Sequence, residues 1–225
     1  MPKPYQIFVG CPFSHDVRAS YDRLKRELEA ETPLSLVLAD TVGISSSDYL
    51  LEHITVQIRD SANCIFDATG ANANVSLEVG IAHTVPVDFI LTIKTRKPSA
   101  KAQAREAGTA GSREVRSIIS DLQGKNRIEY KQFDGLKRQL EQRYLVRMPY
   151  MKRWHAFKSQ YKGMVPYALQ LFADLRSSQR SLKPKLASQL EGSGFSASQV
   201  LDALVANKLI SVLRGRTGGI YYPPK

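Results

Sequence analysis

The chain has 225 residues, a hydrophobic content of 43% and a formal net charge of +11 at pH 7. This length suits one ordinary domain with a small second one, or two modest domains. No apolar run reaches the about 18 residues of a membrane span, and the first residues lack the pattern of a secretory signal. Two cysteines, Cys11 and Cys64, lie at predicted strands, and no Cys/His spacing suggests a metal site. We therefore expect a cytoplasmic protein without disulfides, resident metal or cofactor.

The positive charge is confined to the second part of the chain. Residues 1–90 hold 6 Lys and Arg against 12 Asp and Glu, whereas residues 91–225 hold 26 against 9. Such asymmetry indicates a small-molecule domain that is acidic or neutral, followed by a basic part that meets a polyanion. A solvated basic surface without a partner explains the charge equally well.

The first part of the chain alternates predicted strands and helices. Short apolar runs predict five strands, at residues 5–10, 34–39, 63–68, 88–94 and 126–131. Helical spacing of apolar residues predicts helices at 15–31, 45–61, 73–85, 114–124 and 133–145. The strands are continuous apolar runs, as in a parallel sheet with helices on both faces. We expect a flavodoxin-like, doubly wound α/β domain over residues 1–145, with a basic, flexible surface excursion at 95–113.

The last part of the chain predicts a second, smaller unit. Residues 146–164 are basic and rich in aromatic residues, and we interpret them as a linker. Helices are predicted at 165–178, 182–192 and 196–209, the last opening with a Ser-x-x-Gln capping pattern. Two short strands then flank an Arg-Gly-Arg-Thr-Gly-Gly turn. Three helices followed by a β-hairpin predict a winged helix-turn-helix domain over residues 165–225.

One acidic residue stands out in the third predicted helix, which starts near Asn74. Glu78 lies about one turn into it, among apolar residues such as Val75 and Val79. The polar loops after the first three strands should converge with it, because ligands of open parallel sheets bind beyond the carboxyl ends of the strands. Glu78 either faces a pocket there or only complements the helix dipole, and the pattern by itself supports both interpretations.

Three motifs resemble the TIR-like superfamily, and within it the bacterial proteins that are nucleoside 2-deoxyribosyltransferase-like or predicted to bind nucleotides. They are a Pro-Phe-Ser loop after the first strand, an Asp and a Ser-rich loop after the second, and Asp-x-Thr-Gly-x-Asn-x-Asn-Val-x-x-Glu-x-Gly at residues 67–80. The last motif is the specific one. The resemblance covers about residues 5–95 and continues more weakly to about residue 145.

The resemblance implies cleavage of an N-glycosidic bond between a sugar and a base, with Glu78 as the catalytic residue. A carboxylate on the ribose face stabilises or attacks an oxocarbenium-like sugar. NAD⁺ is the first substrate implied, because TIR-like domains commonly cleave it and its nicotinamide is already cationic before it leaves, and antiphage defence is the implied setting. A nucleoside or nucleotide glycosidase, a deoxyribosyltransferase and a nucleotide-sensing DNA-binding regulator without catalysis remain alternatives.

The resemblance also implies a wider set of substrate-binding residues. Phe13 is expected to stack on a base, although core packing is the simpler role, and Asn72 and Asn74 to contact ribose or hold the loop. Asp67 is expected to orient that loop. The full set is Gly10, Pro12, Phe13, Ser14, Asp40, Ser45, Ser46, Asp67, Asn72 and Asn74.

The winged-helix interpretation supplies candidate nucleic-acid contacts. In such domains the third helix enters the major groove and the wing contacts the backbone. The residues at these positions are Lys183, Lys185, Ser198, Gln199, Arg214 and Arg216. Since the third helix has few base-reading side chains, a protein partner is an equal alternative for this domain. A homo-oligomer is expected, and a membrane partner is not.

Overall fold

The computed structural model describes residues 2–39, 47–70, 72–95, 127–178, 181–215 and 218–222. Within these ranges, the side chains at 47–49, 178, 181–183, 213–215 and 218–222 are not described. The predicted helix at 114–124 lies outside the described residues, as does the predicted excursion except for residue 95.

A parallel sheet of five strands forms the first part of the molecule, in the order β2-β1-β3-β4-β5. This order confirms the doubly wound prediction. The inner strand β1 pairs with both neighbours, with Val9 opposite Leu38 on one side and Ile65 on the other. The strands are β1 (Lys3–Gly10), β2 (Ser35–Leu38), β3 (Ser61–Asp67), β4 (Asp88–Lys94) and β5 (Arg127–Tyr130).

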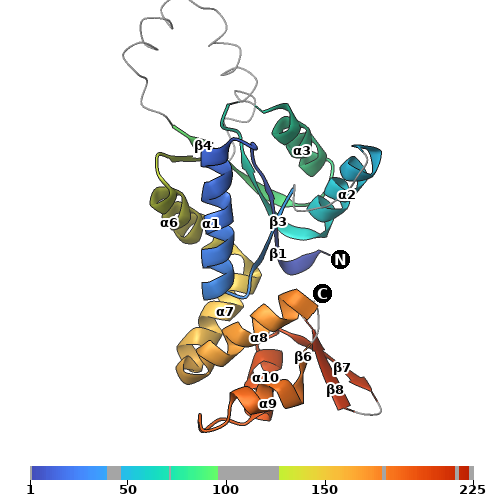
Figure 1. The fold of residues 1–225 in the computed structure, drawn as a ribbon, viewed down its shortest axis with the longest axis vertical. Helices are drawn as coiled ribbons and strands as arrows, with labels where there is room; N and C mark the ends of the chain where they lie inside the picture. Colours follow the sequence, from blue (N-terminus) through green and yellow to red (C-terminus); the bar gives the residue numbers. More distant parts are fainter. Residues whose placement is uncertain are drawn as a thin grey trace, which may run out of the picture.

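Helices cover both faces of this sheet (Figure 1). On one face lie α1 (His15–Glu31) and α6 (Phe133–Arg143), and on the other α2 (Ser47–Asp60) and α3 (Ala73–His83). Side chains along a strand point alternately to the two faces. Accordingly, one hydrophobic cluster takes Phe8 and Phe66 on the α2/α3 face, and the other takes Ile7, Val9 and Ile65 on the α1/α6 face.

The expected linker is a packed helix instead, and that interpretation was wrong. Within residues 146–164, α7 (Pro149–Gln160) begins with a proline at its first position and buries four large side chains: Tyr150, Met151, Trp154 and Phe157. These positions share one helical face, so the aromatic residues that suggested a connector are core residues. Their cluster includes residues of both predicted domains, from Ile7 to Ile210.

The C-terminal region is helical, with a small antiparallel sheet of order β6-β8-β7. Ser196 and Gln199 form the predicted capping box at the start of α10. Short helices η2 (Leu145–Arg147) and η3 (Lys162–Met164) flank α7. The other elements are α8 (Val165–Ser178), β6 (Ser181–Leu182), α9 (Lys183–Gln189), α10 (Ala197–Ala206), β7 (Ser211–Gly215) and β8 (Gly218–Tyr222).

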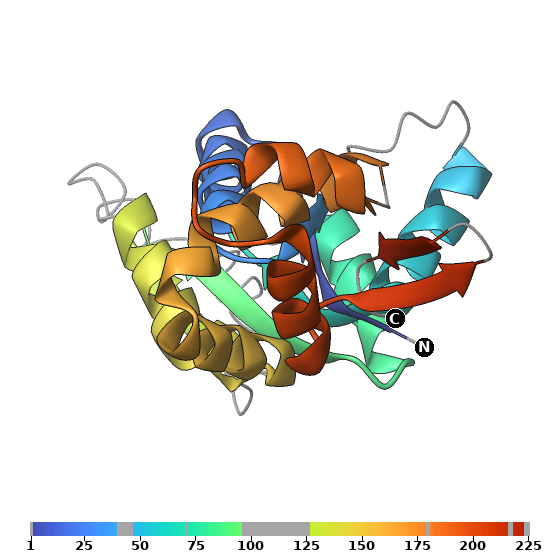
Figure 2. The ribbon, with the colours of Figure 1, turned by 90° about the horizontal axis from the view of Figure 1, so that it is seen from below.

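The C-terminal region lies at the amino ends of the parallel strands (Figures 1 and 2). The guanidinium of Arg176 in α8 donates hydrogen bonds to the carbonyl oxygens of Glu29 and Leu34, at 2.6 and 3.2 Å. Tyr150 donates to the carbonyl of Leu209 at 2.7 Å. These bonds join the end of α1 and the amino edge of the sheet to the last helices. In the described part of the chain, no helix has the length and apolarity needed to cross a membrane.

Candidate active site

Glu78 occupies a core-facing position of α3. The buried residues of this helix have the spacing i, i+3, i+4 and i+7 that defines one helical face. They are Val75, Glu78, Val79 and Ala82. Glu78 is only 6% exposed, so a carboxylate stands where the pattern of the helix calls for an apolar side chain.

The carboxylate of Glu78 packs directly against Gly10, the last residue of β1. A Cβ atom on Gly10 would lie 1.9 Å from Oε2 of Glu78 and 2.8 Å from a ring carbon of Phe66. Gly10 is therefore needed for close approach, because no side chain fits between β1 and the carboxylate. Gly10 also pairs with Phe66 of β3. The structure thus brings two predicted site residues together at the carboxyl ends of the two neighbouring strands β1 and β3.

Glu78 lacks the partners that normally accompany a buried charge. Among the described residues it forms no ion pair, and its buried Oε2 has no hydrogen-bond partner. Burial raises the pKa of Glu78 from 4.5 to about 7. Burial, with a smaller contribution from the charge of Glu78, raises the pKa of the Cys64 thiol to about 12. An unpaired buried carboxylate costs folding free energy, so its presence calls for a functional explanation.

Asp67, at the end of β3, has the opposite environment. It is fully buried, and its Oδ2 accepts hydrogen bonds from the hydroxyls of Tyr21 at 3.0 Å and Tyr130 at 2.7 Å. Its Oδ1 accepts the backbone N–H of Thr69 at 2.9 Å, which fixes the start of the following loop. Burial and the charge of Asp67 raise the pKa of both tyrosines well above the ordinary value. Thr92 completes this network through a 2.5 Å bond with Tyr21.

The structure does not bring Asp67 to Glu78. Phe66 lies in the cluster under α3, and the next residue, Asp67, points to the opposite face, toward α1 and β5. The alternation within β3 contained this information, since neighbouring strand residues face opposite sides of a sheet. Asp67 therefore holds the start of the loop after β3 through the N–H of Thr69, while Glu78 lies on the α3 face with its Oε2 unpartnered.

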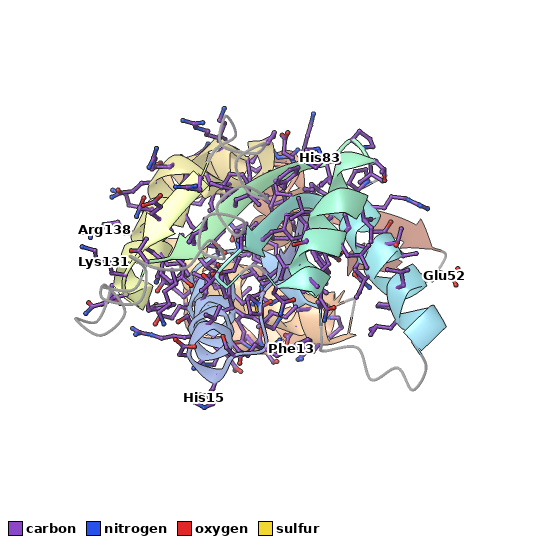
Figure 3. The ribbon with its side chains drawn as sticks, turned by 90° about the horizontal axis from the view of Figure 1, so that it is seen from above. Phe13, His15, Glu52, His83, Lys131 and Arg138 are labelled. Carbon is purple, nitrogen blue, oxygen red and sulfur yellow. The ribbon has the colours of Figure 1, made fainter. Side chains whose placement is uncertain are left out.

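The loop after β1 connects the site to α1. Pro12 is buried, whereas Phe13 is 58% exposed, which is incompatible with core packing. Ser14 is exposed and precedes α1, where its carbonyl accepts the N–H groups of Val17 and Arg18 at 3.1 and 2.9 Å. Figure 3, which looks onto the carboxyl ends of the strands, shows Phe13 at the start of α1. An aromatic face is thus exposed three residues beyond Gly10.

The loop after β3 is organised by Asn72. Its side-chain oxygen accepts the N–H groups of Asn74 and Val75, at 2.9 and 3.3 Å, and caps α3. Asn74 itself is exposed. The remaining predicted residues of this site, Asp40, Ser45 and Ser46, lie outside the described residues. Sequence reasoning missed Phe66 beside Gly10 and the tyrosines around Asp67, although the alternation in β3 pointed to the first.

Lys185, Ser198 and Gln199, the predicted nucleic-acid residues whose side chains the structure describes, lie apart from this site. Lys185 pairs with Asp174 at 2.8 Å, and Gln199 is occupied by the capping box. Ser198 is half-buried. Arg216 and the side chains of Lys183 and Arg214 are not among the described residues. The role of these six residues in nucleic-acid contact therefore stays a prediction.

The chemistry available at the candidate site is that of a single carboxylate. Throughout the described ranges, no three His, Cys, Asp or Glu side chains gather in an arrangement that holds a metal ion. An isolated carboxylate with a pKa near 7 is able to stabilise a cation, act as a nucleophile or transfer a proton near neutral pH. Such groups mark functional sites when they face the ligand-binding edge of a parallel sheet.

The fold and this site define a doubly wound α/β protein with an unpaired carboxylate at the carboxyl edge of its sheet. No protein-family model matches the sequence, and no curated protein matches it significantly. Among solved structures, a 2-desoxiribosyltransferase from Leishmania mexicana is similar, with 12% identity and a TM-score of 0.37 over 44% of this chain and 70% of that one. A conserved protein from Enterococcus faecalis V583 is similar with 14% identity and a TM-score of 0.43, over 61% and 98% of the two chains.

Proposed function

We propose that the parallel-sheet domain cleaves the N-glycosidic bond of a nucleotide, with Glu78 as the residue that faces the sugar. The observation that carries this proposal is the carboxylate of Glu78, buried against Gly10 with an unpartnered Oε2 at the ligand-binding edge of the sheet. Breakage of the bond from C1′ to the base nitrogen leaves a positive charge on the sugar. A preformed carboxylate in a low-dielectric setting stabilises that charge strongly.

NAD⁺ is the substrate whose cleavage requires the fewest catalytic groups besides Glu78. Its nicotinamide is cationic and departs as a neutral base with the electron pair of the glycosidic bond. No proton donor is therefore required, and one ionised carboxylate is enough. The resulting oxocarbenium-like ribose either receives the carboxylate oxygen as a transient ester or is attacked by water. The products of hydrolysis are ADP-ribose, nicotinamide and one proton.

Base release from NAD⁺ by the purified full chain tests this proposal. Glu78→Gln keeps the shape of the side chain and removes its charge, so we expect a loss of activity on the order of a thousandfold. Glu52→Gln is the matched control, because Glu52 is exposed on α2 (Figure 3) and should leave activity unchanged. Full activity in the Glu78 variant would remove this residue from the mechanism.

A second candidate is a nucleoside glycosidase or deoxyribosyltransferase, and the raised pKa of Glu78 favours it. At a pKa of about 7 the carboxyl is half protonated near neutral pH and is able to donate a proton to a neutral base as it departs. The two candidates differ in their pH dependence. Cleavage of NAD⁺ should rise as pH increases through about 7, whereas cleavage that needs the acid form should fall over the same range.

A third candidate is a nucleotide-sensing regulator, in which the last part of the chain is a winged helix that contacts DNA or a protein. The order of α8, α9 and α10 followed by the antiparallel pair β7–β8 supports it. In this case Glu78 contributes to ligand affinity without catalysis. Calorimetry with NAD⁺ and nucleosides that detects binding but no base release would favour this candidate over both enzymes.

A further inference from the structure

Two consecutive helices carry an excess of positive charge that the proposed function does not use. Residues 131–164 contain nine Lys and Arg but only two acidic residues. Both acids are already engaged, since Asp134 lies 3.6 Å from Arg23 and Glu141 lies 3.8 Å from Lys137. Most of the other cations of this segment have no acidic residue three or four positions away to neutralise them.

We propose that this segment binds duplex DNA through a surface that we call the α6–α7 basic surface. Figures 1 and 2 show α6 and α7 following one another along one side of the molecule, and Figure 3 places Arg138 on the outer side of α6. All its members are exposed, and within the described ranges none forms an ion pair. They are Arg138, Arg143, Arg147, Lys152, Lys158 and Lys162.

The α1 helix shows that unpaired cations are not the rule in this protein. There, Arg18, Arg23 and Lys25 each pair with an acid four residues further on, at 3.2, 2.7 and 2.7 Å. Such pairs need only an acidic residue at the right spacing. On the α6–α7 basic surface only Arg138 has an acidic residue three or four positions away, so the positive charges of the other members stay available to an external anion.

The neighbouring residues indicate which polyanion fits. Tyr144, Tyr150, Trp154 and Phe157 of this region are buried, and Phe133 and Tyr161 are half-buried, so the described residues offer no fully exposed Phe, Tyr or Trp ring on which single-stranded nucleic acid could stack. Val146, at 40%, is the only large hydrophobic side chain exposed within 131–164, which is too little to enter a membrane. Cations on rigid helices instead match the phosphates of a duplex, and the major groove of B-DNA admits a helix where that of duplex RNA does not.

The helix expected to read DNA is a weaker candidate. α10 contains no Lys or Arg, and it exposes the acidic side chain of Asp202. In addition, the positive charge of Lys185 in α9 is paired with Asp174. The charges that contact phosphate are therefore better supplied by α6 and α7 than by the start of α10.

Anisotropy of a labelled duplex of mixed sequence, titrated with the full chain over about 50 to 200 mM salt, tests the proposal. The double variant Arg147→Ala/Lys152→Ala removes two proposed phosphate contacts. We expect its affinity to fall roughly tenfold or more and the slope of log affinity against log salt to decrease by about 2. The matched control is Arg26→Ala/Arg59→Ala, two exposed cations on α1 and α2, which should change affinity less than about twofold.

Several outcomes would overturn the proposal. One is that the unmodified chain does not bind the duplex. Another is an equal loss of affinity in both double variants, which would indicate that binding depends only on the net charge of the protein. Equal binding of single-stranded DNA, duplex RNA or polyglutamate would refute duplex DNA as the partner. A loss of affinity confined to Lys183→Ala/Arg214→Ala would place the contact on the predicted winged helix instead. Base release is measured separately, so failure of this proposal leaves the proposed function intact.

Discussion

Glu78 and Asp67 are two buried carboxylates at the same edge of one sheet, and they differ in what surrounds them. Asp67 receives three hydrogen bonds, two from tyrosine hydroxyls and one from the backbone of Thr69. Glu78 has an unpartnered oxygen and a pKa raised to about 7. Burial alone therefore does not identify a functional carboxylate. The absence of compensating donors makes Glu78 the candidate, because a purely structural group is usually satisfied or replaced by an apolar one.

The largest effect on stability is expected from Asp67→Asn. The amide cannot accept all three hydrogen bonds, so at least one buried tyrosine hydroxyl loses its acceptor. We expect the free energy of unfolding to fall by about 3 kcal/mol, measured by denaturant titration. Asp134→Asn is the control, because Asp134 is exposed and should change stability by less than about 0.5 kcal/mol. Equal stability of the Asp67 variant would remove the contrast between the two carboxylates.

Gly10→Ala probes the Glu78 side of the comparison. The added methyl group occupies the position of Oε2, so the carboxylate has to move or the strand has to shift. We expect a stability loss of about 1–3 kcal/mol from overpacking and, because the carboxylate is displaced, a fall in base release on the order of a hundredfold. Gly80→Ala is the control in α3, since a Cβ there meets nothing within 4 Å. Unchanged activity in Gly10→Ala would contradict the contact as described.

Glu78→Gln should stabilise the protein in a pH-dependent manner. The folded state holds the proton of Glu78 with a pKa of about 7 and the unfolded chain with the ordinary value of 4.5, so stability falls as pH rises between these values. The glutamine variant does not titrate. At about pH 8 it should be more stable than the unmodified chain by about 3 kcal/mol, and near pH 5 the gain should shrink to about 1 kcal/mol or less. Unfolding titrations at both pH values check this, and a gain independent of pH would refute the raised pKa.

The smallest effect on folding is expected from Phe13→Ala. Its side chain is 58% exposed, so the free energy of unfolding should change by less than about 0.5 kcal/mol. Loss of stacking should nevertheless raise KM for base release by roughly tenfold, since stacking on an aromatic ring contributes about 1–3 kcal/mol per base. Leu77→Ala, another exposed apolar residue at 53%, is the control on α3. An unaltered KM would exclude Phe13 from base recognition.

The sequence predicts the described sheet and helices well, because β1 to β4 each contain a continuous apolar run and the helices have a periodic buried face, whereas β5 alternates between apolar and charged residues. The sequence also indicates that Glu78 lies on the buried face of α3, since Val75, Val79 and Ala82 share that face. The contact between Glu78 and Gly10 was not predictable. It depends on where α3 settles against β1, and no local pattern links two residues so far apart in the chain.

The error at α7 has a different origin. The basic and aromatic composition of residues 146–164 dominated the interpretation, although Tyr150, Trp154 and Phe157 recur at the spacing of one helical face. The opposite roles of Glu78 and Asp67 also followed from a pattern that was not used. Adjacent residues of β3 face opposite sides of the sheet, so a carboxylate after Phe66 belongs to the α1 side.

The Arg176 contact with the end of α1 has a geometric consequence. α1 has 17 residues and spans about 25 Å, from the loop that contains Phe13 to the carbonyl that Arg176 binds. The C-terminal helices are thus held a full helix length away from Glu78. A macromolecule bound to them would contact the amino-end side of the sheet, whereas Glu78 lies near the carboxyl end of β1.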